Sequence, residues 1–102
     1  MAETITEIQQ SLDTIILKPS NYKVIIYNDE HTPFDFVISL LINLFRHNEV
    51  TAIELANTVH NAGSGVAGIY SYEVAEQKAM EGTDISRKNG YPLLLKVEKE
   101  WV

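Results

Sequence analysis

The sequence contains no cysteine, and this absence excludes several classes of site at once. Without thiols the chain has no disulfide, no thiolate metal ligand and no cysteine nucleophile. It also lacks any apolar run near the ~18 residues that a membrane-spanning helix needs. The first ten residues, MAETITEIQQ, carry acids where a secretory signal carries Lys or Arg, so we expect a cytoplasmic protein.

Positive charge is scarce as well. Eight Lys and Arg stand against fourteen Asp and Glu, a net charge of −6. Such a chain repels phosphate backbones and anionic lipid headgroups, so we expect neither nucleic acid nor membrane as a partner. A cationic group is a better candidate ligand, although a negative net charge often serves only solubility.

The length and composition predict one globular domain preceded by an arm. The 102 residues are 45% hydrophobic and 22% charged, which is ordinary for a single core. Residues 1–20 hold no aromatic side chain and end in Lys18-Pro19-Ser20. Their apolar residues fall at helical spacings of three and four, but short isolated helices are marginal in water. We therefore expect a flexible arm over 1–20 and a core domain over 21–102.

The first elements of the core are a strand and a helix. YKVIIY at 22–27 is rich in β-branched and aromatic residues and predicts a strand. Thr32 is then expected to cap a helix, with Pro33 at its first position. An apolar stripe follows, made of Phe34, Val37, Leu41 and Leu44 and widened by Ile38 and Phe45.

The second half predicts helix, strand, helix and strand. A helix over about 50–62 has Ile53, Ala56 and His60 recurring on one face, with Gly63 as a left-handed stop. We expect a strand over 66–70, a helix over 72–89 that Gly82 weakens, and a strand over 92–97. This order indicates an α+β fold, with helices packed on a mainly antiparallel three-stranded sheet.

The turn at 28–33 is the first place where chemistry is concentrated. Three side chains with hydrogen-bond acceptors stand together just before Phe34: Asn28, Asp29 and Glu30. Asn and Asp are also common in turns, where their side chains form local hydrogen bonds. A catalytic alternative would use His60 as a base and Asp29 or Glu30 as its carboxylate. No motif supplies a nucleophile, because AGSGV at 62–66 is not the G-x-S-x-G elbow. The three histidines are too scattered to indicate a metal, so we expect neither an enzyme nor a cofactor.

Three segments resemble the ClpS family, the adaptors that recognise N-degrons for a Clp protease. They are YKVIIYNDEHTPFDFV at 22–37, VHNAGSGVAGIYSYEVAEQK at 59–78 and PLLLKVEK at 92–99. Together they span nearly all of 22–99 in the family's order and spacing. A signature of this length is far more specific than a single short motif.

The resemblance implies a site and two kinds of partner. Asn28, Asp29 and His60 would hold the α-amine of a polypeptide's first residue. Its side chain would enter a pocket lined by Ile26, Thr32, Phe34, Val37, Ala56, Val59 and Leu93. Exposed Glu73 and Lys78 on the third helix would dock on the N-domain of a Clp ATPase, ClpA or ClpC. N-degron proteins would be the substrates, and we expect a monomer.

Three positions depart from the family's commoner pattern. Glu30 stands where many members have Asp, Phe34 where many have Met, and Ala56 where many have a larger residue. We expect a deeper pocket that accepts Trp or Tyr at least as well as Leu. One alternative keeps the fold but has the protein alter a Clp ATPase's substrate choice without binding N-degrons.

Overall fold

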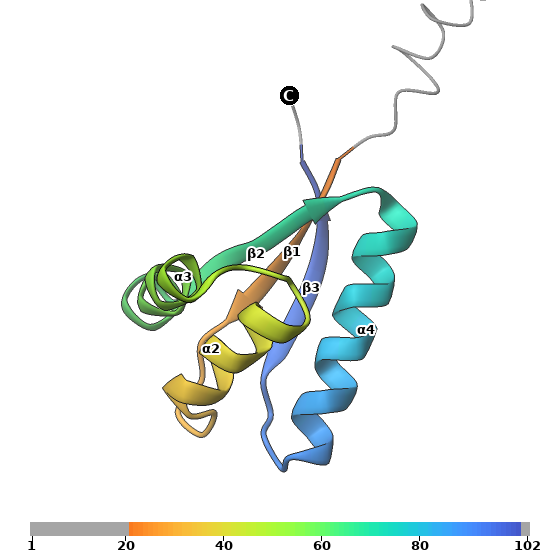
Figure 1. Cartoon of the computed structure of the whole chain (residues 1–102). Helices are drawn as coiled ribbons and strands as arrows, with labels where there is room; N and C mark the ends of the chain where they lie inside the picture. Colours follow the sequence, from red (N-terminus) through yellow and green to blue (C-terminus); the bar gives the residue numbers. More distant parts are fainter. Residues whose placement is uncertain (1–20, 101–102) are drawn as a thin grey trace, which may run out of the picture.

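A computed structural model describes residues 21–100, so the predicted arm and the last two residues lie outside the described part. The elements are β1 (Tyr22–Tyr27), α2 (Phe34–Asn43), α3 (Glu49–Ala62), β2 (Ser64–Tyr70), α4 (Tyr72–Lys88) and β3 (Leu94–Lys99) (Figure 1). This β-α-α-β-α-β order confirms the predicted α+β fold. No helix among the described residues is long and apolar enough to cross a membrane.

The sheet has β1 at its centre, flanked by β2 and β3, and both pairings are antiparallel. Pairing with β3 is regular from Tyr22 opposite Lys99 to Tyr27 opposite Leu94. Pairing with β2 shifts between Val24 and Ile25, so β2 accommodates one extra residue there. The central position of β1 follows from its composition, since YKVIIY is the most apolar of the three strands.

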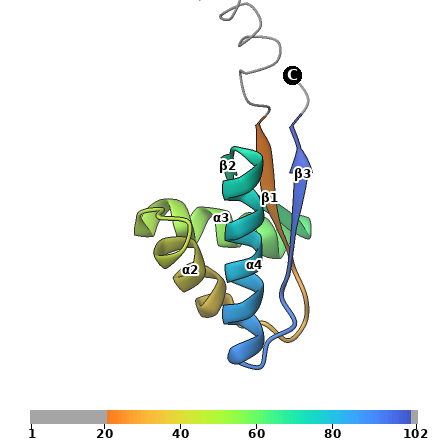
Figure 2. The ribbon, with the colours of Figure 1, turned by 90° about the vertical axis from the view of Figure 1, so that its right-hand side faces the viewer.

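The three helices cover one face of the sheet (Figure 2). Helix α4 lies against all three strands, α3 against β2, and α2 against α3. The face that α4 turns to the sheet is made of small buried residues, Ala75, Ala79, Gly82 and Ser86. Because these side chains are short, the helix axis comes close to the strands. Val24, Ile26 and Leu41 lie at the centre of the core and are fully buried.

Two helix predictions need correction. Pro33, not Thr32, is the N-cap of α2, because the Thr32 hydroxyl is hydrogen-bonded to Asp29 instead. In α3 the buried face is Ala52, Ala56 and Val59. The predicted stripe was therefore wrong at Ile53 and His60, which are exposed. The cause is a small rotation of the helix that sequence spacing alone does not determine.

The last two elements also differ from prediction. Helix α4 runs through Gly82 without a break, because Gly82 is where it meets β3: a Cβ there would lie 2.6 Å from Leu95 Cδ2. Strand β3 begins two residues later than predicted, at Leu94. The Arg87 guanidinium donates to the carbonyls of Tyr91 and Leu93, which holds the connecting segment out of the sheet.

Candidate functional site

A hollow of about 270 Å³ opens where β1 ends and α2 and α3 meet. It is lined by Asn28, Asp29, Glu30, Thr32, Phe34, Val37, Ala56, Val59 and His60. The amide of Asn28 donates to the carbonyl of Gly63 at 2.9 Å, which ties the end of β1 to the end of α3. Gly63 adopts the predicted left-handed conformation, with φ of 92°. This corner brings the turn at 28–32 beside His60.

Asp29 organises the turn. Its Oδ1 accepts from the amides of His31 and Thr32, each at 2.7 Å, and its Oδ2 accepts from the Thr32 hydroxyl at 2.7 Å. Partial burial acts to raise the pKa of this carboxyl, but the bonds from Thr32 and the two amides outweigh it and leave the pKa lowered. Asp29 therefore remains ionised, and its charge faces the hollow.

The polar side of the hollow contains acceptors that the protein itself does not use. Within residues 21–100, no protein group is hydrogen-bonded to the side chains of Asn28, Glu30 or His60. All three are exposed to solvent. The His60 ring lies edge-on to Phe34, with ring centroids 6.3 Å apart. These acceptors are thus available to a ligand with several donors.

The apolar side is formed by α2 and α3. Val37, Ala56 and Val59 are 6%, 1% and 3% exposed, so they form a buried floor. Phe34 is 38% exposed at the first position of α2 and lies at the mouth. Small-molecule sites commonly start near ~300 Å³, so the hollow is suited to one amino-acid residue rather than a folded surface. Its chemistry fits a small cation attached to an apolar group.

The structure brings together most of the predicted site residues. Asn28, Asp29 and His60 all line the hollow, and so do Thr32, Phe34, Val37, Ala56 and Val59. Ile26 and Leu93 do not. They are 0% and 1% exposed and belong to the core. The predicted pocket lining therefore differs from the structure at these two positions, because both side chains are packed inside the core.

Glu30 also lines the hollow, although the sequence analysis placed it among the acceptors of the turn without assigning it to the amine-binding set. The available signal was a second acid directly after Asp29 in the turn. Since Asp29 is occupied by three hydrogen bonds, the neighbouring carboxylate is the freer acceptor. A pattern of residue types could not show which of the two acids the turn would use.

The predicted docking residues on α4 lie in different surroundings. Glu73 is exposed in the first turn, as expected. Lys78 is half-buried, and its ammonium donates to the carbonyl of Leu44 at 2.8 Å and lies 5.9 Å from the centre of the Tyr70 ring. The expectation of an exposed Lys78 was therefore wrong. Its charge stabilises the end of α2.

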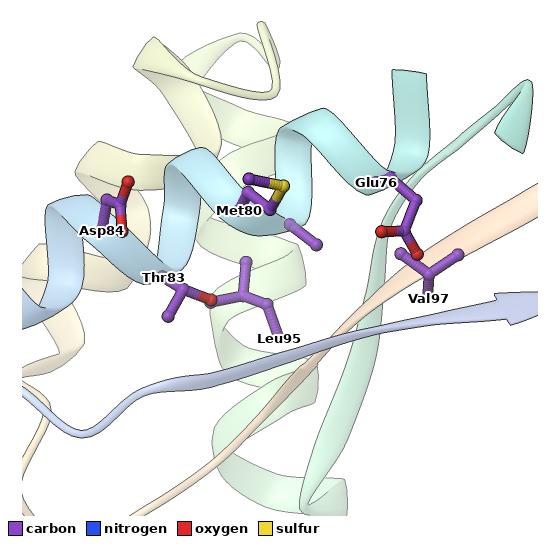
Figure 3. A pocket seen from close by; sticks show the side chains of 7 residues that line it. Glu76, Met80, Thr83, Asp84, Leu95 and Val97 are labelled. Carbon is purple, nitrogen blue, oxygen red and sulfur yellow. The ribbon is translucent and has the colours of Figure 1, made fainter. Parts of the chain in front are cut away.

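A second hollow, of about 310 Å³, lies between α4 and β3 and shares no lining residue with the first. Glu76, Met80 and Asp84 extend from the helix, while Leu95 and Val97 point up from the strand (Figure 3). Met80 is 64% exposed. Glu73 precedes Glu76 by three residues and Met80 by seven, so it stands on the same side of α4.

Comparison with known proteins identifies the family. The family model described as "ATP-dependent Clp protease adaptor protein ClpS" matches residues 17–96. The chain belongs to the ClpS family. ClpS adapters of three Shewanella species illustrate the similarity: those of S. piezotolerans and S. halifaxensis are 39% identical over 97 residues, and that of S. denitrificans is 38% identical over 91 residues. The alignments cover 95%, 95% and 89% of both chains.

A solved ClpS structure has the same fold. It is Agrobacterium tumefaciens ClpS2 bound to L-phenylalaninamide, with a TM-score of 0.78 and 39% sequence identity. The match covers 80% of the present chain and 99% of that one. The chain is thus a ClpS adaptor of the Clp protease in both sequence and fold.

Proposed function

We propose that this ClpS protein binds other polypeptides by their first residue, when that residue has a free amine and a bulky apolar side chain. It then delivers them to a Clp ATPase. One observation carries the proposal: unused acceptors and a buried apolar floor meet in a single hollow. We further propose that it acts in the cytoplasm as a monomer, on the N-domain of ClpA or ClpC.

The amine would be held by converging acceptors. An α-ammonium has three donors, so it needs two or three acceptors around one point. Asn28, which follows β1, and His60 on α3 offer two of them. We assign the third to the Glu30 carboxylate, while the ionised Asp29 adds negative charge and one remaining lone-pair direction on Oδ2.

The side chain of the bound polypeptide's first residue would pass Phe34 and pack on three residues, Val37, Ala56 and Val59. The similar ClpS2 was solved with L-phenylalaninamide, a compound with a free α-amine and a benzyl side chain. That ligand has both features for which the present hollow has matching groups. The comparison supports the proposal on chemical grounds.

Magnitudes explain why both features are required. A hydrogen bond to a charged group contributes ~1.5–3 kcal/mol, and burial of a Leu or Phe side chain another ~1.5–3 kcal/mol. Micromolar affinity needs about 8 kcal/mol. The side chain alone falls short of this value, and three hydrogen bonds to the amine, ~4.5–9 kcal/mol in all, reach it only at the top of their range and before the cost of association is subtracted. An internal Leu and an N-terminal Ala should therefore both bind poorly.

Fluorescence anisotropy tests this directly. A labelled peptide that begins with Leu should bind, and its N-acetylated twin should bind at least ~100-fold more weakly, because it loses the charge and leaves acceptors unpaired. His60→Ala should abolish binding of the free peptide. His31→Ala is the matched control, since His31 is exposed on the same turn and does not line the hollow. Equal affinity for the two peptides would overturn the proposal.

A further inference from the structure

The sheet has a second face, which none of the described helices covers (Figure 2). We call it the outer sheet face. Alternation places on it Lys23, Ile25 and Tyr27 of β1, Leu94, Lys96 and Glu98 of β3, and Ser64, Val66 and Ile69 of β2. These residues form three cross-strand rows, since each β1 residue pairs with one from each neighbour.

The outer sheet face carries two exposed apolar side chains. Ile69 and Leu94 are 47% and 44% exposed and stand at opposite corners, and Ile25 between them is 9% exposed. Its positive groups are Lys23 and Lys96, and the Lys96 ammonium lies 6.0 Å from the centre of the Tyr27 ring. The face therefore offers an apolar surface with two lysines and one acid, Glu98.

We propose that the outer sheet face is a docking surface for this protein's own N-terminal arm, with residues 4–16 bound as an amphipathic helix. Over these residues Ile5, Ile8, Leu12, Ile15 and Ile16 share one face at helical spacing. Short helices that are marginal alone become stable when such a face packs against an apolar surface. The sheet supplies the surface that the arm lacks.

The lengths agree with this arrangement. The thirteen residues 4–16 make a helix about 20 Å long, and a six-residue strand such as β1 is also about 20 Å long. The amide of Glu100 donates to the carbonyl of Asn21 at 2.8 Å, which fixes the arm's attachment at the start of the central strand β1. Residues 17–20 reach up to ~13 Å, enough to turn the chain back over the strands.

Charge favours this surface over the hollow beside α4. The arm holds three acids, Glu3, Glu7 and Asp13, and one lysine, Lys18, so its net charge is −2. The outer sheet face has Lys23 and Lys96 against Glu98, a net charge of +1. The hollow between α4 and β3 has Glu76 and Asp84, which would repel the arm. Complementary charge thus selects the sheet.

Paramagnetic NMR on the full chain tests the proposal. Because the chain has no cysteine, Gln10→Cys places a single nitroxide on the polar side of the proposed helix. We expect the amide signals of Ile25, Val66, Ile69 and Leu94 to lose most of their intensity. The amides of α2, across the sheet, should keep theirs. Loss spread evenly over the surface, or no loss, would overturn the proposal.

Two variants and one mixing experiment complete the test. Ile8→Ser with Leu12→Ser should restore the sheet signals, while Thr6→Ser, off the stripe, should leave the broadening unchanged. Ile69→Ser should weaken the broadening from the other side of the contact. Spin-labelled chain mixed with isotope-labelled, label-free chain should give no broadening. If the mixture also shows the broadening, the surface binds a second copy and the proposal is wrong.

Discussion

Asp29 and Thr32 show how a single turn sets up the candidate site. The Asp29 carboxylate receives three hydrogen bonds, all from His31 and Thr32, and so shapes the loop that presents Asn28 and Glu30. The same bonds lower the pKa of Asp29 against the opposing effect of burial. At the scale of the residue, the Asp29 side chain thus both fixes the conformation of the turn and places a negative charge beside the hollow.

Thr32→Val should destabilise the protein in a pH-dependent way. Partial burial acts to raise the pKa of Asp29, but its hydrogen bonds hold the pKa below the ordinary value of an Asp carboxyl, so its contribution to stability is present above that ordinary value and is lost as pH falls through the folded pKa. Loss of one partly exposed hydrogen bond should lower the free energy of unfolding by about 1 kcal/mol near neutral pH, and by less in acid. Urea unfolding of both proteins, measured once near neutral pH and once in acid, gives this difference in the free energy of unfolding.

The control for this prediction is Ser39→Ala, which removes an exposed acceptor of the Asn43 amide on α2. Its effect should be small and the same at both pH values, because no ionisable group takes part. A Thr32→Val penalty that did not change with pH would contradict the role assigned to the Asp29 charge.

Ala56 should determine which first residues bind. It is 1% exposed at the floor of the hollow, where a larger residue would reduce the space. We expect peptides that begin with Trp or Tyr to bind at least as tightly as one that begins with Leu. Ala56→Val should weaken the Trp peptide about tenfold, which corresponds to 1.4 kcal/mol, and the Leu peptide less.

Ala52→Val is the matched control, since Ala52 is buried one turn earlier in α3 and does not line the hollow. It should add similar core strain and leave the order of peptide affinities unchanged. A clear preference of the unmodified protein for small or β-branched first residues would contradict the prediction.

At the scale of the element, the contact between the end of α3 and the end of β1 determines the geometry of the site. Gly63 ends the helix in a left-handed conformation, and its carbonyl accepts from Asn28. One residue thus orients the turn after β1 relative to His60. Helix α4 plays a different part, because its small buried face and Lys78 hold the sheet and the end of α2 together.

Gly63→Ala should reduce both stability and peptide binding. Nothing lies within 4 Å of the added Cβ, so the cost is the left-handed backbone, about 1–2 kcal/mol. Gly90→Ala is the control: its φ is 83°, its Cβ also meets nothing, and it lies away from the hollow. Both variants should melt earlier in calorimetry, but only Gly63→Ala should bind the Leu peptide more weakly. Equal peptide binding by the two variants would contradict the role given to Gly63 at the end of α3.

At the scale of the whole molecule, the two candidate surfaces are built from different elements. The first-residue hollow comes from the end of β1 and from α2 and α3, whereas Glu73 and the exposed Met80 stand on α4. No residue belongs to both. Capture of a substrate and docking on an ATPase should therefore be separable by mutation.

Glu73→Lys should weaken binding to the N-domain of a Clp ATPase at least tenfold and leave peptide affinity unchanged. His60→Ala should do the reverse. Glu54→Lys makes the same charge change on α3, where Glu54 is exposed and does not line the hollow, and it should affect neither affinity. Calorimetric titrations with the N-domain and with the peptide measure both affinities. If His60→Ala retained full peptide binding, the alternative of an ATPase modulator without N-degron binding would be favoured.

Sequence alone determined the order of elements, the fold class, the left-handed stop at Gly63 and the cluster of acceptors after β1, because these follow from local propensity and spacing. Only the tertiary structure decided which side chains face which way. It turned His60 outward, moved Ile26 and Leu93 into the core, and used Lys78 inside the fold. It also occupied Asp29 with its own turn and left Glu30 free. The physical reason is that helix rotation and hydrogen-bond choice depend on neighbours far away in the sequence, which no local pattern records.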